Sequence, residues 1–315
     1  MNRPCRLLAL AALGLAFVVV LVGAYVRLSD AGLGCPDWPL CYGQPLPGGI
    51  ADGDALARAW KEMGHRYLAG TLGVLILLLA VCSWRARRAQ WLAGSVLALA
   101  IFQASLGAWT VTMLLKPAIV TAHLLGGMTI LALLTWLALS LFSHESMPAM
   151  RALRVPAALA LGVLAIQIAL GGWVSSNYAA LACPDLPLCH GQGLPPMDFA
   201  SAFHVLRELG QTPQGGRLSR ETLTAIHWSH RVFALLAVAV IGWAAYRARG
   251  VSKGLAALVA GLLALQFSLG VANVLVSRPL ALAAAHNAGA ALLLAALVVL
   301  NFFVFRGSVA HRVSK

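Results

Sequence analysis

Charged side chains are scarce in this sequence. Only 10% of its 315 residues are Asp, Glu, Lys or Arg, whereas a soluble domain carries about 25%. Apolar residues make up 60% of the chain and the mean hydropathy is +0.83, which excludes a soluble globular protein. The sequence therefore predicts an all-α polytopic membrane protein in contact with the lipid bilayer. Its eight membrane-spanning windows of about 20 apolar residues are 7–28, 64–84, 91–113, 119–142, 155–176, 224–245, 254–276 and 281–304.

Acidic residues are scarcer than basic ones: ten Asp and Glu against 23 Lys and Arg, for a formal net charge of +13. A large basic excess is one signature of nucleic-acid binding, but here the basic residues cluster on one side of the predicted membrane, so no nucleic-acid partner is expected. Cytoplasmic segments are enriched in Lys and Arg. We therefore expect a multi-pass protein of the inner (plasma) membrane, with both termini cytoplasmic and the loops 29–61 and 177–222 outside. The basic cluster comprises Arg3, Arg6, Arg85, Arg87, Arg88, Arg151, Arg154, Arg247, Arg249, Lys253, Arg306, Arg312 and Lys315.

The chain contains an internal repeat. The loop segment 33–44 matches 181–192 at nearly every position without a gap, and Gln103-Ala-Ser-Leu-Gly107 matches Gln266-Phe-Ser-Leu-Gly270 at an offset of 163. Repeats of this kind indicate duplicated structural units. We predict two tandem four-helix bundles of the same topology, residues 1–145 and 146–315, related by a pseudo-twofold axis along the membrane normal. The second unit carries an extra loop segment, 199–216.

Each predicted unit contributes two histidines near the outer end of its helices. His65-Arg66 and His230-Arg231 occupy equivalent positions in the repeat, and His123 is equivalent to His286. Bundle cores commonly hold haem between facing imidazoles, so His65 with His123, and His230 with His286, are candidate iron ligands. Arg66 and Arg231 follow as partners for haem propionates, although snorkelling to the membrane interface explains them equally well.

One position distinguishes the two units. Glu62 lies three residues before His65, on the same helix face, whereas the second unit has His227 there. An acid in a low-dielectric pocket suits proton-coupled chemistry, which makes Glu62 the candidate catalytic residue of the first unit. The alternative is an interfacial acid that faces water or pairs with Lys61 or Arg66.

Six cysteines are present, and none forms a C-x-x-C motif. Cys35 with Cys41, and Cys183 with Cys189, are the simplest disulfides in an extracytoplasmic compartment. They would staple two lids over the two pockets, or act as redox-active dithiols. Cys5 and Cys82, near the cytoplasmic helix ends, are expected to be small apolar residues.

The ordered set of residues resembles the haem A synthase family over nearly the whole chain. The segment from Tyr25 through the Cys-Pro-Asp loop to Gly43, the Glu62-x-x-His-Arg66 motif, and the later histidines carry the resemblance. It implies oxidation of the C8 methyl group of haem O to a formyl group by successive hydroxylations. It also implies that His65, His123, Arg66 and Glu62 serve the substrate haem O, and that His230, His286 and Arg231 serve a haem b cofactor.

Three other functions fit part of the pattern. A di-haem electron-transfer cytochrome of the quinol-oxidising type explains the four histidines but neither Glu62 nor the cysteine loops. A thiol-oxidising membrane enzyme explains the cysteines alone. A transporter built on the duplicated bundle would place helix breaks near mid-membrane. Haem O synthase and the cytochrome oxidase assembly machinery are expected partners without a supporting motif, while the oxygen source, the electron acceptor and a homo-oligomeric state stay open.

Overall fold

The computed structural model describes residues 3–142, 148–212 and 215–306, and this part of the chain is almost entirely helical. Arg312, Lys315 and the predicted unit boundary at 145/146 lie outside it. Eight helices are long and apolar enough to cross a membrane, which confirms the predicted number. The elements are α1 (Arg3–Leu28), α2 (Gly53–Arg85), α3 (Gln90–Thr112), α4 (Pro117–Leu141), η1 (Pro148–Leu153), α5 (Arg154–Ser176), η2 (Ala179–Leu181), α6 (Phe199–Ala202), α7 (Arg220–Ala248), α8 (Lys253–Leu275) and α9 (Leu280–Arg306).

Helix α2 begins at Gly53, whereas the predicted apolar window began at residue 64. Its first residues are polar, and the side chain of Asp52 caps them by accepting a hydrogen bond from the amide of Asp54. Helix α7 likewise starts at a serine cap, with Ser219 accepting from Thr222. Such caps satisfy amides at the helix start. They extend α2 and α7 beyond the apolar windows toward the two long loops, and so position the residues before His65 and His230.

The helices of the two predicted units pack in the same order. In the first, α1 packs on α2, α2 on α3, α3 on α4 and α4 on α1; in the second, α5 packs on α7, α7 on α8, α8 on α9 and α9 on α5. Between them, α4 contacts α9 and α5, while α9 contacts α1. The equivalence of these pairings is consistent with a duplicated four-helix unit.

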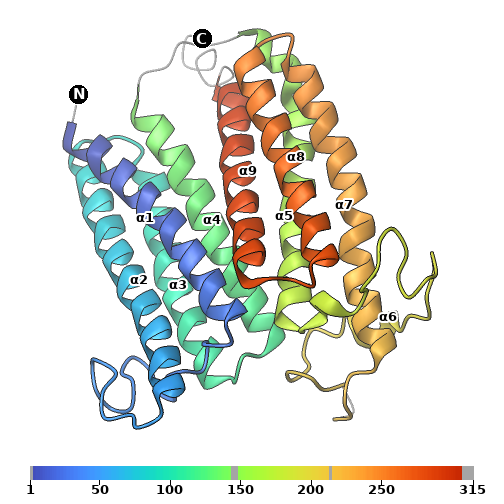
Figure 1. Cartoon of the computed structure of the whole chain (residues 1–315). Helices are drawn as coiled ribbons and strands as arrows, with labels where there is room; N and C mark the ends of the chain where they lie inside the picture. The colour runs from blue at the N-terminus through green and yellow to red at the C-terminus, as the bar shows by residue number, and fades with distance from the viewer. Residues whose placement is uncertain (1–2, 143–147, 213–214, 307–315) are drawn as a thin grey trace.

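The two ends of the helix bundle differ in their loops. Figure 1 shows α1 beginning and α9 ending at the top of the molecule, while the loops after α1 and α5 lie at the bottom. We name the bottom the loop end and the top the terminal end. All four cysteines of the repeat lie at the loop end, in the disulfides Cys35–Cys41 and Cys183–Cys189, as predicted.

The expectation for Cys5 and Cys82 is wrong. They form a third disulfide, with their Cα atoms 5.7 Å apart, which links the start of α1 to the end of α2 at the terminal end. A sequence separation of 77 residues carried no sign of this pairing. The contact arises because α1 and α2 run side by side in opposite directions, which brings the first turn of one beside the last turn of the other.

Candidate functional site

The two cysteine loops have the same internal structure. In the first, both carboxylate oxygens of Asp37 accept backbone hydrogen bonds, from Tyr42 at 2.7 Å and Gly43 at 2.8 Å. In the second, Asp185 accepts from His190 and Gly191, both at 2.7 Å. These backbone donors, with Gly43 and Gly191 contributing most, hold the pKa of each aspartate below its usual value. We name these loops, residues 33–44 and 181–192, the first and second caps.

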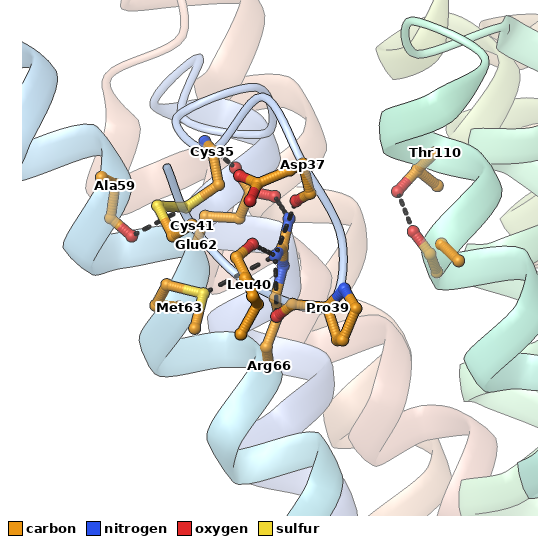
Figure 2. A network of polar contacts seen from close by, with 12 residues as sticks. Cys35, Asp37, Pro39, Leu40, Cys41, Ala59, Glu62, Met63, Arg66 and Thr110 are labelled. Atoms are coloured by element: carbon orange, nitrogen blue, oxygen red, sulfur yellow. Dashed lines mark hydrogen bonds and ion pairs between the residues drawn. A yellow bond between two sulfur atoms is a disulfide. The ribbon is translucent and has the colours of Figure 1, made fainter. Parts of the chain in front are cut away.

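An arginine from the helix that follows each cap in the chain holds that cap in place. Arg66 on α2 donates to the carbonyls of Asp37 at 3.0 Å and Leu40 at 2.7 Å (Figure 2). Arg231 on α7 donates to the carbonyls of Asp185 at 2.8 Å and Leu188 at 3.2 Å. Both guanidinium groups are thus held by peptide carbonyls of the caps at the loop end. A contact with haem propionates stays a prediction.

Glu62 and His227 perform the same task in the two units. The carboxyl group of Glu62 is buried. It accepts a hydrogen bond from the Cys35 amide at 2.9 Å and forms an ion pair with Arg66 at 2.5 Å (Figure 2). The Nδ1 atom of His227 accepts from the Cys183 amide at 3.2 Å, and its Nε2 atom contacts Arg231 at 3.3 Å. The pairing of Glu62 with Arg66, one of the two alternatives from the sequence, is present. Anchoring the cap is therefore common to both positions, and the negative charge is specific to the first.

Each of the four predicted histidines packs its ring against a glycine of a neighbouring helix. A Cβ atom built on Gly23 of α1 would lie 2.8 Å from the ring of His65, and one on Gly107 of α3 would lie 3.2 Å from His123. In the second unit, a Cβ atom built on Gly171 of α5 would lie 3.1 Å from the ring of His230, and one on Gly270 of α8 would lie 3.2 Å from that of His286. A larger residue would displace the ring. The sequence repeat paired Gly107 with Gly270, and the offset of 148 between the cysteine loops likewise pairs Gly23 with Gly171. The contacts of these glycines with the histidines were not anticipated.

The histidines meet in the predicted pairs. The rings of His65 and His123 are 6.5 Å apart between centroids and inclined at 85°. Two metal–imidazole bonds of about 2.0–2.1 Å and ring radii of about 1.15 Å would separate two centroids on opposite sides of a metal ion by roughly 6.3–6.5 Å. His230 and His286 stand on α7 and α9, the helices of the second unit that correspond to α2 and α4.

The donor set fits haem better than a protein-bound metal ion. Among the described residues, no group of three or more His, Cys, Asp and Glu converges on one point. A haem needs only axial ligands from the protein, because its macrocycle supplies the other donors. The Nδ1 atoms of His65 and His286 are buried without a hydrogen bond in the described part of the chain. One imidazole of each predicted pair therefore has a free ring nitrogen, which suits the holding of such a group.

The extra segment of the second unit reaches the first. Lys116, just before α4, forms an ion pair of 2.7 Å with Glu208. The neighbouring Arg207 is buried, and it donates to the Asn177 side chain at 2.5 Å while lying over the ring of Trp173. Burial lowers the pKa of Arg207. These contacts anchor the described part of the segment, residues 199–212, at the loop end beside the second cap.

Comparison with known proteins identifies relatives along almost the full chain. The family model described as cytochrome oxidase assembly protein matches residues 6–298. A protein of Shewanella oneidensis named Heme A synthase is 42% identical over 311 residues, which cover 92% of this chain and 94% of that protein. A protein of the same name from Caulobacter vibrioides is 28% identical over 93% of this chain and 94% of its own. A third, from Halalkalibacterium halodurans, is 30% identical over 62% of this chain.

Proposed function

The chain belongs to the cytochrome oxidase assembly protein family, and from this premise we propose that it is a haem A synthase, which oxidises the C8 methyl group of haem O to a formyl group. The observation that carries the proposal is the 42% identity, over 92% of the chain, with a protein named Heme A synthase. An enzyme of this kind is an oxidoreductase. The paired histidines at the loop end supply a suitable place for a haem substrate.

We assign the substrate haem O to the first unit and a haem b cofactor to the second. His65 and His123 would hold the substrate, and His230 and His286 would hold haem b as axial ligands. The equivalent packing of all four rings on glycines supports two haem sites of one design. The difference between Glu62 and His227 supports different roles for them, because only the first unit offers a carboxylate to the reaction.

In the proposed mechanism, Glu62 interacts with the charge that develops on the reacting methyl carbon. Converting a methyl to a formyl group adds one oxygen atom to the reacting carbon; written with water as the source of that atom, the conversion releases four electrons and four protons. The Cys35 amide and the ion pair with Arg66 at 2.5 Å hold the Glu62 side chain beneath the first cap. A carboxylate in a site sheltered by the first cap would stabilise positive charge at that carbon or accept a proton from it. His230 and His286 would hold haem b, whose chemistry is one-electron transfer. The electron acceptor is not identified by any motif.

The cysteine loops have a structural role in this proposal. Each disulfide closes a short loop whose carbonyls and amides are held by Arg66 and Glu62, or by Arg231 and His227. The caps would exclude water from the two haem sites and position these side chains. No exchange of reducing equivalents through the cysteines is needed.

The haem content of cells tests the reaction directly. Haems would be extracted with acidified solvent from cells that express a haem O synthase with and without this chain, and separated by chromatography. We expect haem A only when both proteins are present. Haems B and O without haem A, from cells in which the purified chain still binds haem, would contradict the proposal and favour electron transfer.

We further propose that the loop end faces the outside of the inner membrane and the terminal end the cytoplasm. The basic residues Arg3, Arg6, Arg85 and Arg247 at the terminal end support this orientation. The structure joins Cys5 and Cys82 in a disulfide at the terminal end. Because thiols are kept reduced in the cytoplasm, the proposed orientation implies that this disulfide is opened to a dithiol in the cell.

Trapping thiols in intact cells measures this orientation. Cells would be quenched with acid, denatured and alkylated, and the peptides analysed by mass spectrometry. Cys5 and Cys82 should carry the alkyl group, whereas Cys35, Cys41 and the second pair should react only after reduction. The reverse labelling would contradict the orientation and leave the reaction untouched.

A further inference from the structure

Three of the four histidines are contacted by a glutamine from a neighbouring helix. The Nε2 atom of Gln103 on α3 lies 3.0 Å from Nδ1 of His123 and donates to the carbonyl of the same residue at 2.7 Å. Gln167 on α5 lies 3.2 Å from Nδ1 of His230 and donates to the His230 carbonyl at 3.2 Å. Gln266 on α8 lies 3.3 Å from Nε2 of His286.

Each of these glutamines has an unused acceptor. The Oε1 atoms of Gln103, Gln167 and Gln266 are buried and have no hydrogen-bond partner within the described residues. Two of the oxygens lie against glycines three residues after the histidine, Gly126 and Gly289, at positions that a Cβ atom would occupy. The amide fits only because these two positions on α4 and α9 are glycines, which leave room for its oxygen. A buried amide with an unsatisfied oxygen costs free energy, so simple packing does not account for three of them.

His65 is the exception. At the repeat offset of 148, which pairs Gly23 with Gly171, the position of Gln167 corresponds to Val19. Gly171 lies under the ring of His230 and Gly23 under the ring of His65, so Val19 occupies the place from which an amide would reach His65. The His65 ring has no hydrogen bond in the described part of the chain, whereas His286, whose Nδ1 atom is likewise without a partner, keeps the contact of its Nε2 atom with Gln266. Valine provides neither a donor nor an acceptor.

A hydrogen-bonding partner matters to an imidazole that binds metal. Such an imidazole coordinates through one ring nitrogen and presents an N–H at the other, where an acceptor fixes the orientation of the ring and raises its basicity. In the observed orientation the amide of Gln103 or Gln167 donates to the ring nitrogen and to the carbonyl of the same histidine. To accept from the N–H of a ligating imidazole, the amide makes a half-turn of its last torsion and gives up the bond to that carbonyl. Loss of such a partner typically weakens metal affinity about 10- to 100-fold.

We infer that three glutamines are positioning residues, each of which strengthens one histidine as a haem ligand: Gln103 for His123, Gln167 for His230 and Gln266 for His286. His65 lacks such a partner, and we infer that its bond to the haem iron is the weaker one and breaks when the haem is released. This inference rests on the proposed function and deepens it. A substrate site must release its haem after each reaction, whereas a cofactor site must retain it. The second unit has two supported histidines, and the first has one supported and one unsupported histidine.

Haem release from the purified protein tests the inference without reference to activity. Wild type and variants would be purified from cells that also express a haem O synthase, mixed with excess apomyoglobin, and followed by absorbance as haem O and haem b transfer. Val19→Gln should slow haem O release about 10-fold, and Gln167→Val should speed haem b release by a similar factor. Low-temperature EPR of the ferric protein would report the ligation of each haem.

Val18→Gln is the matched control, because Val18 is adjacent to Val19 but exposed on the outside of α1. Its release rates should equal those of the wild type. Gln103→Val provides a second test in the first unit and should speed haem O release; retention of haem b in that variant shows that the protein is folded. Equal haem O release from V19Q and V18Q, or wild-type retention of haem b in Q167V, would overturn the inference. A wild-type protein without any bis-histidine haem signal would overturn the inference together with the assignment of the four histidines as ligands, whereas absence of haem A from the same cells would refute the proposed function.

Discussion

Replacing Glu62 with histidine is expected to reduce haem A formation by at least about 100-fold, the usual contribution of a general acid or base, while haem b stays bound. Histidine already fills this position in the second unit, where His227 accepts a hydrogen bond from the Cys183 amide and contacts Arg231. The E62H variant should therefore keep the first cap anchored to α2. What it removes is the negative charge. The ratio of haem A to haem O in cell extracts, normalised to haem b in the purified protein, measures the effect.

The matched control is His227→Gln, at the equivalent position of the second unit. It alters the anchoring of the second cap without touching the carboxylate, so haem A formation should be close to that of the wild type. Glu62→Gln adds a variant that keeps the shape and the acceptor of the side chain. Normal haem A formation in E62H and E62Q would remove Glu62 from the mechanism and leave it the structural role that it shares with His227.

Gly171→Leu is expected to lower the content of bound haem b about 10-fold or more, the loss typical of a disturbed ligand shell. A Cβ atom at this position would already lie 3.1 Å from the His230 ring, and a leucine side chain would push the ring away from His286. The expected effect is on ligand geometry, since the surrounding helix keeps its apolar character. Pyridine haemochrome quantification and the absorbance of the oxidised and reduced protein measure it.

Gly162→Leu is the control on the same helix. Nothing lies within 4 Å of a Cβ atom built on Gly162, and leucine favours a helix over glycine. This variant should bind as much haem b as the wild type and be at least as stable. Equal haem content in G171L and G162L would contradict the assignment of His230 as an axial ligand held on α5.

The alternation of long apolar windows with short basic segments determined the membrane fold, because only helices satisfy their backbone polar groups within lipid. The windows located all eight long helices, although the starts of α2 and α7 were set too late. Hydropathy does not register a polar first turn, and those turns depend on capping by Asp52 and Ser219. The pairing of Cys35 with Cys41 was also evident from the sequence, because six residues of separation leave few other partners in one loop.

For the site, the repeat identified His65, His123, His230 and His286, but it could not assign the work of their neighbours. Glu62 was selected as an acid near a histidine, and the structure adds its hydrogen bond with the Cys35 amide and its ion pair with Arg66. The glutamines were part of the repeat motif without an evident purpose. Their role became apparent only where α3, α5 and α8 bring them against the rings of helices distant in sequence.

Composition, periodicity and duplication by themselves determined the class of protein, the number of spans and the candidate ligands. These features are carried by residue type and spacing along the chain. Tertiary structure alone decided which groups meet: the guanidinium of Arg66 and the ring of His227 hydrogen-bond to the first and second caps, and the sulfur of Cys5 forms a disulfide with that of Cys82. Such contacts depend on the distance and rotation between packed helices, which a linear pattern does not specify. The same packing places Val19 where the second unit has Gln167, which adds a second difference between the two sites to that of Glu62 and His227.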